Sequence, residues 1–374
     1  MDAATVVFLA VVGGRFALPL FIFKYPLPAI VACLVLDGVD QTIFQSFGYD
    51  PPGYQGYDKA MDVYYLALAY LAAMRNWTSP AAFAAAHFLY FYRLVGVLAF
   101  ELTQWRPLLI VFPNTFEYFF IAYELLRLRW DPRRFDLRWW VGVAAVIWVV
   151  VKLPQEWWIH IARLDLTDEI AAHWWVLPVL ALLVAVALVV VRRRVVPRLG
   201  PPDWGWRVAA EPTPVEIDTA AERTAWTATH ARVWSWVTLE KAVLVGLLSV
   251  IFAQVLPGLR MSNLDLFLGL AVIVVFNAAL SIWAAQRTNS VESIAVAFVI
   301  RLAVNIAIVL VSDSLLGRGD DVNRDASIFF VFLLSLLTVL HDRYWPVHEV
   351  RVTHARRAGG APGRGACTAP ASAP

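Results

Sequence analysis

Long apolar runs recur along most of this chain, and they constrain its fold more than any other feature. Each has roughly 18–25 residues, the length that an α-helix needs to cross the hydrocarbon core of a bilayer. At that depth the backbone polar groups must be satisfied within the segment, as they are in a helix. Charged residues make up 16% of the 374 residues, against about 25% in soluble domains. The sequence therefore predicts an all-α fold, a polytopic transmembrane helical bundle in a lipid bilayer.

Hydropathy predicts about 11 membrane helices in two groups. Their ranges are 4–23, 26–47, 58–75, 79–101, 106–128, 138–160, 174–196, 236–259, 264–286, 291–316 and 326–345. We therefore expect an N-terminal membrane part over 1–196 with about seven helices, and a C-terminal membrane part over 236–345 with about four. Residues 197–235 are Pro-rich and predict a cytoplasmic linker with a short amphipathic helix from Thr219. Residues 346–374 predict a disordered cytoplasmic tail.

Arginine clusters predict the orientation in a cell membrane. They lie near 127–138, 192–198 and 351–364, and the positive-inside rule makes all three regions cytoplasmic. Counting back places the N-terminus and the loop at 48–57 on the extracytoplasmic side. One re-entrant segment before Arg127 would reverse the side of that loop.

Four aspartates lie at the facing ends of two apolar segments: Asp37, Asp40, Asp58 and Asp62. The first two are three residues apart and the last two are four apart, so each pair shares a helix face. Carboxylates at membrane depth need a partner, a proton or a metal. If the two helices are antiparallel neighbours, Mg²⁺ or Mn²⁺ would relieve the repulsion between the carboxylates and clamp a phosphate.

The spacing of these aspartates resembles the motif of the CDP-alcohol phosphatidyltransferase family, D-x2-D-G-x2-A-R-x8-G-x3-D-x3-D. The four aspartates match, whereas the motif's Gly, Ala, Arg and second Gly positions hold Gln41, Phe44, Gln45 and Tyr54. The resemblance implies that all four aspartates are metal ligands. It also implies that Asp62 is the catalytic base on an acceptor alcohol and that a lipid-linked substrate is used.

Other interpretations of the aspartates stay open at this point. Asp58 could cap its helix, where the helix dipole also favours Asp62. Asp37 and Asp40 could pair with Arg15 or Arg93, which are membrane arginines that need partners themselves. The cluster could also conduct protons or ions.

Further polar residues are predicted at membrane depth. Arg93 is a candidate to hold a substrate phosphate, with a salt bridge to Asp37 or Glu117 as the alternative. Arg15, Glu117 and Lys152 are cavity candidates. Glu156 and His160 share a helix face, either as two metal ligands or as interface anchors. Arg301 and Asn305 share a face as well, and we expect them to fix helix packing.

Several function classes have no support in the sequence. There is no phosphate-binding glycine loop, no H-E-x-x-H, no C-x-x-C and no G-x-S-x-G. A net charge of +2 without a basic stripe predicts no nucleic-acid partner. The leading hypothesis is a divalent-metal-dependent membrane transferase that acts on a phosphate-linked lipid substrate. The alternatives are a transporter or channel with a polar path and a membrane protein without chemistry.

Overall fold

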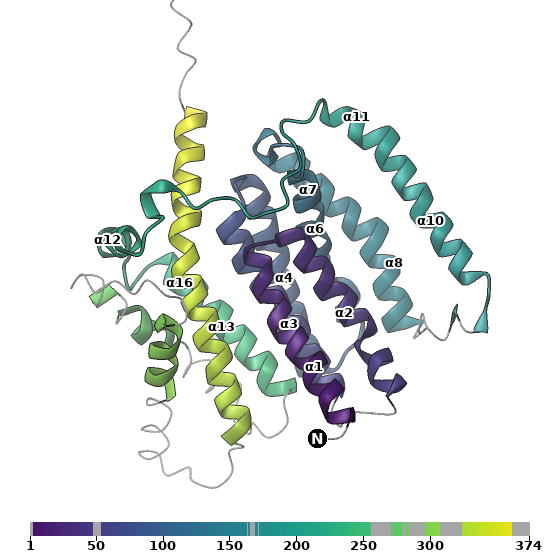
Figure 1. Ribbon diagram of the computed structural model, residues 1–374, viewed down its shortest axis with the longest axis horizontal. Coiled ribbons are helices and arrows are strands. Elements are labelled where there is room, and N and C mark those ends of the chain that lie inside the picture. The colour runs from purple at the N-terminus through teal and green to yellow at the C-terminus, as the bar shows by residue number, and fades with distance from the viewer. Residues whose placement is uncertain are drawn as a thin grey trace, which may run out of the picture.

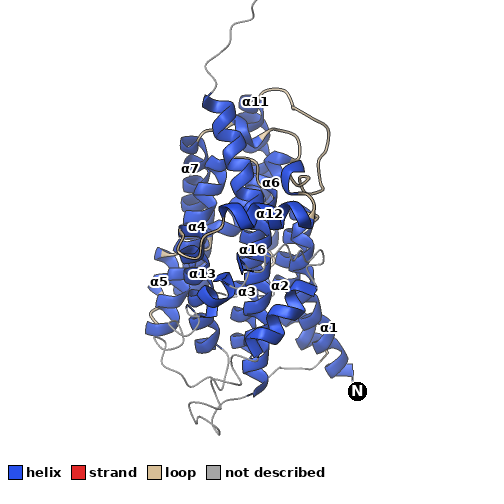
Figure 2. Ribbon diagram, turned by 90° about the vertical axis from the view of Figure 1, so that its left-hand side faces the viewer, coloured by secondary structure: helices blue, strands red, loops and turns tan. Residues whose placement is uncertain are grey.

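The structure, a computed structural model, describes residues 3–47, 54–162, 164, 169–170, 172–255, 271, 273–279, 282–283, 296–306 and 324–360. Within these ranges all regular structure is helical, as Figure 2 shows. The helices in the first half are α1 (Ala3–Ala17), α2 (Pro26–Ser46), α3 (Tyr54–Asn76), α4 (Pro80–Thr103), α5 (Pro107–Val111) and α6 (Thr115–Arg127). Those that follow are α7 (Leu137–Val146), α8 (Leu153–Glu156), α10 (Val176–Val190), α11 (Val196–Leu199), α12 (Ala220–His230), α13 (Trp236–Val255) and α16 (Arg324–Gly360).

Short 3₁₀- and π-helical segments extend several of these helices. They are η1 (Leu18–Phe23) after α1, η3 (Ile147–Lys152) and η4 (Trp157–Ile161) on either side of α8, and η5 (Val191–Val195) between α10 and α11. As a result, α7 to η4 and α10 to α11 are each continuous enough to cross a bilayer. Pro154 and Pro197, which lack an N–H, lie at the starts of α8 and α11 and favour these irregular turns.

Seven helical stretches among the described residues are long and apolar enough to cross a membrane. They are Val6–Phe23, Pro26–Ser46, Pro80–Thr103, Pro107–Arg127, Leu137–Ile159, Val176–Leu199 and Trp236–Gln254. Each coincides with a predicted segment, so a membrane-embedded helical protein is confirmed, whereas the predicted count of about 11 is not. The predicted segments at 264–286 and 291–316 lie largely outside the described residues. Those at 58–75 and 326–345 form α3 and the first part of α16.

Helix α3 is the centre of the bundle (Figure 1). Its side chains from Ala67 to Met74 are all 0% exposed, because α16, α13, α4 and η1 pack around it. It carries too many charged residues to count as an apolar span. Protein neighbours surround it instead of lipid. The N-terminal and C-terminal membrane parts predicted from the sequence therefore share one core.

Helix α10 shows the opposite environment. It lies at the edge of the bundle (Figure 1), and only 6% of the residues in an apolar stretch of the span Val176–Leu199 are buried within the protein. Leu182 and Leu188 are 62% and 63% exposed. An exposed apolar surface of this size is stable in lipid and not in water.

The predicted linker packs on the loop that follows α6. Trp204 Nε1 donates to the Arg127 carbonyl at 3.0 Å, and Arg134 pairs with Asp203 at 2.9 Å. The predicted short helix is α12, which begins with a capping box between Thr219 and Glu222. The linker, α11 and the end of α16 lie at the same end of the bundle (Figure 1). The side of the membrane on which this end lies stays a prediction.

Helix α16 continues beyond the predicted start of the disordered tail. It runs to Gly360, with His348 and Arg351 only 8% and 9% exposed. Arg351 donates to the carbonyls of Arg75 and, at 2.8 Å, Pro212. These long-range contacts explain the difference from the prediction, which rested on local composition. Residues 361–374 of the predicted tail lie outside the described residues.

A close contact between α4 and the turn after α5 yields a first prediction. A Cβ on Gly96 would lie 2.0 Å from the Cβ of Phe112, whereas one on Gly142 would meet nothing within 4 Å. We expect Gly96→Ala to lower the free energy of unfolding by about 1–3 kcal/mol, because the helix and the turn must separate. Gly142→Ala is the control and should be neutral or slightly stabilising. Unfolding in mixed micelles measures both, and equal stabilities would contradict the packing described.

Candidate cation-binding site

Helix α1 brings Arg15 into the bundle by packing closely on α2 and α3. A Cβ on Gly14 would lie 3.2 Å from Leu36 Cδ2, so glycine permits the close approach of α1 and α2. The rings of Phe16 and Tyr64 stack with centroids 4.9 Å apart, and the Tyr64 hydroxyl donates to the Phe16 carbonyl at 3.1 Å. These contacts flank Arg15, which is 6% exposed.

The Arg15 guanidinium contacts all four predicted aspartates. Its Nη1 donates to Asp40 Oδ2 at 2.5 Å and to Asp58 Oδ1 at 2.6 Å. Its Nη2 donates to Asp62 Oδ1 at 2.9 Å and also to Asp37 Oδ1. We call Arg15 and these four residues the aspartate cluster. The predicted convergence of the carboxylates is observed, and so is the predicted pairing of Asp37 and Asp40 with Arg15.

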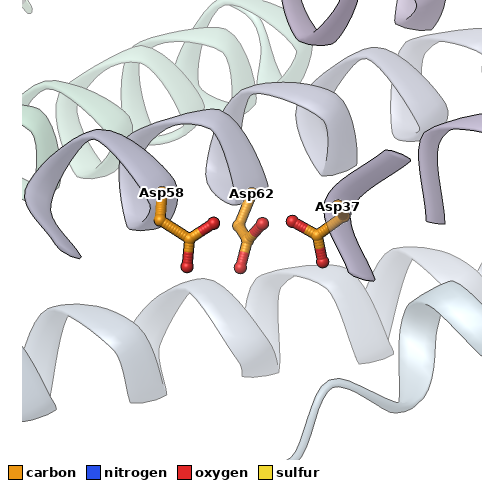
Figure 3. A group of neighbouring side chains, drawn as sticks. All are labelled: Asp37, Asp58 and Asp62. Atoms are coloured by element: carbon orange, nitrogen blue, oxygen red, sulfur yellow. The ribbon is translucent and has the colours of Figure 1, made fainter. Parts of the chain in front are cut away.

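Three carboxylates of the cluster meet in a geometry that suits a metal ion. Ligand oxygens of Asp37, Asp58 and Asp62 all lie within 4.8 Å of one another. Figure 3 shows Asp58 and Asp62 side by side on one helix, with Asp37 reaching toward them from another. Their side chains are 28%, 34% and 42% exposed. Asp40, by contrast, is 0% exposed. The three-carboxylate face is therefore open to a ligand, and Asp40 holds Arg15 in place.

The aspartate cluster carries more negative charge than its arginine neutralises. Four carboxylates against one guanidinium leave a formal charge of −3. Two carboxylates 4.8 Å apart repel by about 3 kcal/mol at an effective dielectric constant of about 20. The nearby Lys59 pairs with Glu101 at 3.0 Å, so its positive charge is neutralised by that acid and not by the aspartates. Protons or a further cation must balance the remaining negative charge of the aspartate cluster.

The capping alternative does not fit the structure. Helix α3 begins at Tyr54, four residues before Asp58, so Asp58 lies within the second turn and does not cap it. Asp58 instead faces Arg15.

Arg93, the predicted phosphate contact, lies elsewhere. Its Nη1 donates to the Phe112 carbonyl at 2.9 Å, where the chain breaks between α5 and α6. In this structure Arg15 therefore contacts the aspartates and Arg93 supports a helix break. A phosphate-binding role for Arg93 stays a prediction.

Glu117 and Lys152, the other cavity candidates, belong to a second polar group on the α6–α8 side. Glu117 accepts from the Tyr65 hydroxyl and, at 2.8 Å, from Asn114 Nδ2. Lys152 lies 4.2 Å from the centre of the Tyr118 ring and interacts electrostatically with Glu117 and Glu156. Together with Arg93 this group has two acids and two bases. The formal charges of this second group therefore cancel, whereas those of the aspartate cluster do not.

The remaining predicted polar residues have structural contacts. Glu156 accepts from the Asn114 amide at 3.3 Å, so it supports the helix break; the side chain of its predicted partner His160 lies outside the described residues. Asn305 accepts from Asn277 at 2.8 Å and donates to Ser335 at 2.9 Å, which confirms its predicted role in helix packing.

No family model, curated protein or solved structure matches this chain.

Proposed function

We propose that this protein is a divalent-cation-dependent membrane transferase that acts on a phosphate-linked lipid substrate. The observation that supports this most is the convergence of Asp37, Asp58 and Asp62 within 4.8 Å on a partly exposed face. A carboxylate set of this kind, with excess negative charge, is a ligand set for Mg²⁺ or Mn²⁺. The aspartate spacing shared with the CDP-alcohol phosphatidyltransferase motif fits the same chemistry.

The proposed chemistry divides the roles among the aspartates. Asp37, Asp58 and Asp62 would hold the cation, which supplies charge neutralisation for the phosphate oxygens of the donor. Asp62, whose side chain is 42% exposed, would take the proton of an acceptor hydroxyl. The hydroxyl oxygen then forms a bond to phosphorus, and the bond from phosphorus to the leaving group breaks with its electron pair. Arg15 keeps the carboxylates together, so the site is formed before the donor enters.

Mn²⁺ binding tests the metal part of this proposal and gives a second prediction. Purified protein titrated with Mn²⁺ should show bound ion by electron paramagnetic resonance. Asp37→Asn and Asp62→Asn should each weaken binding about tenfold or more, because each removes a charged ligand. Asp131→Asn is the matched control, since Asp131 pairs with Arg133 at the surface. Equal Mn²⁺ affinities in all four proteins would remove the basis of the transferase proposal.

Activity tests the chemical part. Liposomes that contain a nucleoside-diphosphate-linked diacylglycerol and an alcohol acceptor should lose the donor when protein and Mg²⁺ are present. A chelator should stop the loss, and Asp62→Asn should reduce it by at least two orders of magnitude. If Mn²⁺ binds as predicted but no phosphate-linked donor is consumed, the proposed cation site is supported and the proposed transferase activity is rejected.

A second candidate function is cation or proton transport. Tyr65 connects the two polar groups, because it lines a cavity of about 10 Å³ with Arg15 and donates to Glu117. That volume is about the minimum for one water molecule, and Tyr65 is the residue that lies between Arg15 of the aspartate cluster and Glu117. Proteoliposomes loaded with a pH-sensitive or Mn²⁺-sensitive dye distinguish the two functions. A flux that Tyr65→Phe abolishes favours transport.

A further inference from the structure

A second site shares no residue with the aspartate cluster. It is a cavity of about 320 Å³ between α12, α13, α16 and the helical residues 296–306. Its volume falls in the range of small-molecule sites. Its walls come from the linker and from the C-terminal helices, so it is independent of the function proposed above.

The charge of this cavity is strongly positive. The basic residues that line it are Arg223, Arg232, Lys241, Arg301 and Arg343. Among the described lining residues, Asp342 is the one carboxylate. Five cations less one anion leave a formal charge of +4 with the histidines neutral. The aspartate cluster has the opposite sign, so the two sites select opposite ligands.

Asp342 holds two of the basic groups of the cavity. Lys241 Nζ donates to its Oδ1 at 2.5 Å, and Arg301 Nη1 donates to its Oδ2 at 2.5 Å. One carboxylate thus holds two cations in fixed positions. On α12, Arg223 donates to the carbonyls of Ile217 at 3.0 Å and Asp218 at 2.5 Å, which fixes its guanidinium beside the start of that helix. Lys241, Arg301 and Arg223 are therefore held in place before any ligand binds.

His341 adds an observation that points to a ligand. It lines the cavity and is 0% exposed, and neither ring nitrogen has a hydrogen-bond partner among the described residues. The Trp345 ring lies parallel to it, with centroids 5.9 Å apart at 7°. Buried polar groups normally have a partner, because an unmet one has lost its hydration without compensation. The ring has no exposed surface, so a ligand in the cavity would supply that partner by displacing the side chains that cover the two nitrogens.

Exposed aromatic side chains lie beside the cavity in the sequence, next to its lining residues Ser235 and Val237. Trp234 and Trp236, at the start of α13, are 86% and 73% exposed, as expected for an interfacial aromatic belt. Apolar side chains including Trp226, Ile282 and Val339 share the lining with the basic groups. The cavity can therefore take a ligand with an anionic head and an apolar or neutral body.

We infer that this cavity binds a phosphate ester, with the phosphate oxygens on Arg223, Arg232 and His341 and the rest of the ligand against Trp226. One guanidinium group can donate two parallel hydrogen bonds to two phosphate oxygens. Basic pockets near a membrane surface bind lipid head groups. The ligand is either the head group of an anionic phospholipid or a soluble phosphate ester, since both present the same oxygens.

Two probes distinguish these sources in the full-length protein. Dioleoyl phosphatidylglycerol in mixed micelles, followed by native mass spectrometry, reports a lipid. Glycerol 3-phosphate and inorganic phosphate, followed by calorimetry, report a soluble anion. Dioleoyl phosphatidylcholine is the neutral comparison. The double variant Arg223→Gln/Arg232→Gln should weaken the binding of the productive probe about tenfold or more.

Two further variants keep the test independent of folding. Arg193→Gln removes one exposed positive charge outside the cavity, and it should leave binding unchanged. His341→Phe keeps the buried ring and removes the two nitrogens, so it should weaken binding without lowering thermal stability. Failure of both probes to bind above the phosphatidylcholine level would overturn the inference. Binding that the cavity variants change no more than Arg193→Gln does would overturn it as well.

Discussion

Replacing Arg15 with methionine is expected to lower the free energy of unfolding by about 3–5 kcal/mol. Arg15 is 6% exposed and donates to four carboxylates. Without it, four acids within a few ångströms have no positive partner and the formal charge of the cluster falls from −3 to −4. Denaturation in mixed micelles, followed by tryptophan fluorescence, measures the loss. Arg133→Met is the control, because that side chain is 62% exposed and pairs only at the surface, where an ion pair contributes about 1 kcal/mol or less.

The same variant reports on the cation site. Saturating Mn²⁺ should restore more stability to Arg15→Met than it adds to the wild type, because the variant has one more uncompensated negative charge. Arg15→Lys keeps the positive charge but loses the forked geometry of the guanidinium. Its free energy of unfolding should therefore lie between those of the wild type and Arg15→Met. An Arg15→Met protein as stable as Arg133→Met would show that the aspartates are neutral and that the arginine does not hold them.

Replacing Arg127 with methionine is the second large effect, again about 3–5 kcal/mol of unfolding free energy. Arg127 Nε donates to Glu124 Oε2 at 2.7 Å, and its Nη1 donates to the Ala209 carbonyl at 3.0 Å and to Glu211 at 3.3 Å. The side chains of Arg127 and Glu124 are 2% and 0% exposed. Loss of the arginine leaves the buried Glu124 with Trp77 Nε1, at 3.0 Å, as its remaining donor among the described residues, and it removes the contacts of this side chain with the linker.

Hydrogen exchange separates these two consequences. The Ala210 amide donates to the Lys24 carbonyl at 2.9 Å, so its protection reports the docking of the linker. Arg127→Met should speed its exchange, and Arg134→Met should do so much less, because the Arg134 side chain is 40% exposed. Equal exchange in both variants would mean that Arg127 does not dock the linker.

The sequence predicts the membrane helices and the convergence of the aspartates, because both depend on local patterns. Apolar length determines a span, and spacings of three and four residues place Asp37 with Asp40 and Asp58 with Asp62 on helix faces. The short connection between α2 and α3 then makes the pairs face each other. Each of these inferences uses residues that are close in the sequence.

What the sequence could not predict depends on long-range packing. Arg15 reaches all four aspartates because Gly14 lets α1 approach Leu36, and no local signal gives that crossing. Arg351 orders the end of α16 by binding the Pro212 carbonyl, although the composition there is typical of a disordered tail. His341 gave no signal, because a single histidine in an apolar segment resembles an ordinary core residue until its neighbours are known.

The central claim is that Asp37, Asp58 and Asp62 together bind a cation, and a crystal of the protein soaked in Mn²⁺ tests it most directly. We predict an anomalous-scattering peak within coordination distance of these three carboxylates, about 2.0–2.2 Å from their oxygens, and no peak at that place in Asp37→Asn. Arg15 should still contact Asp40 when the ion is bound. A wild-type map without density beside the three carboxylates, at a Mn²⁺ concentration that fills other sites, would contradict the account.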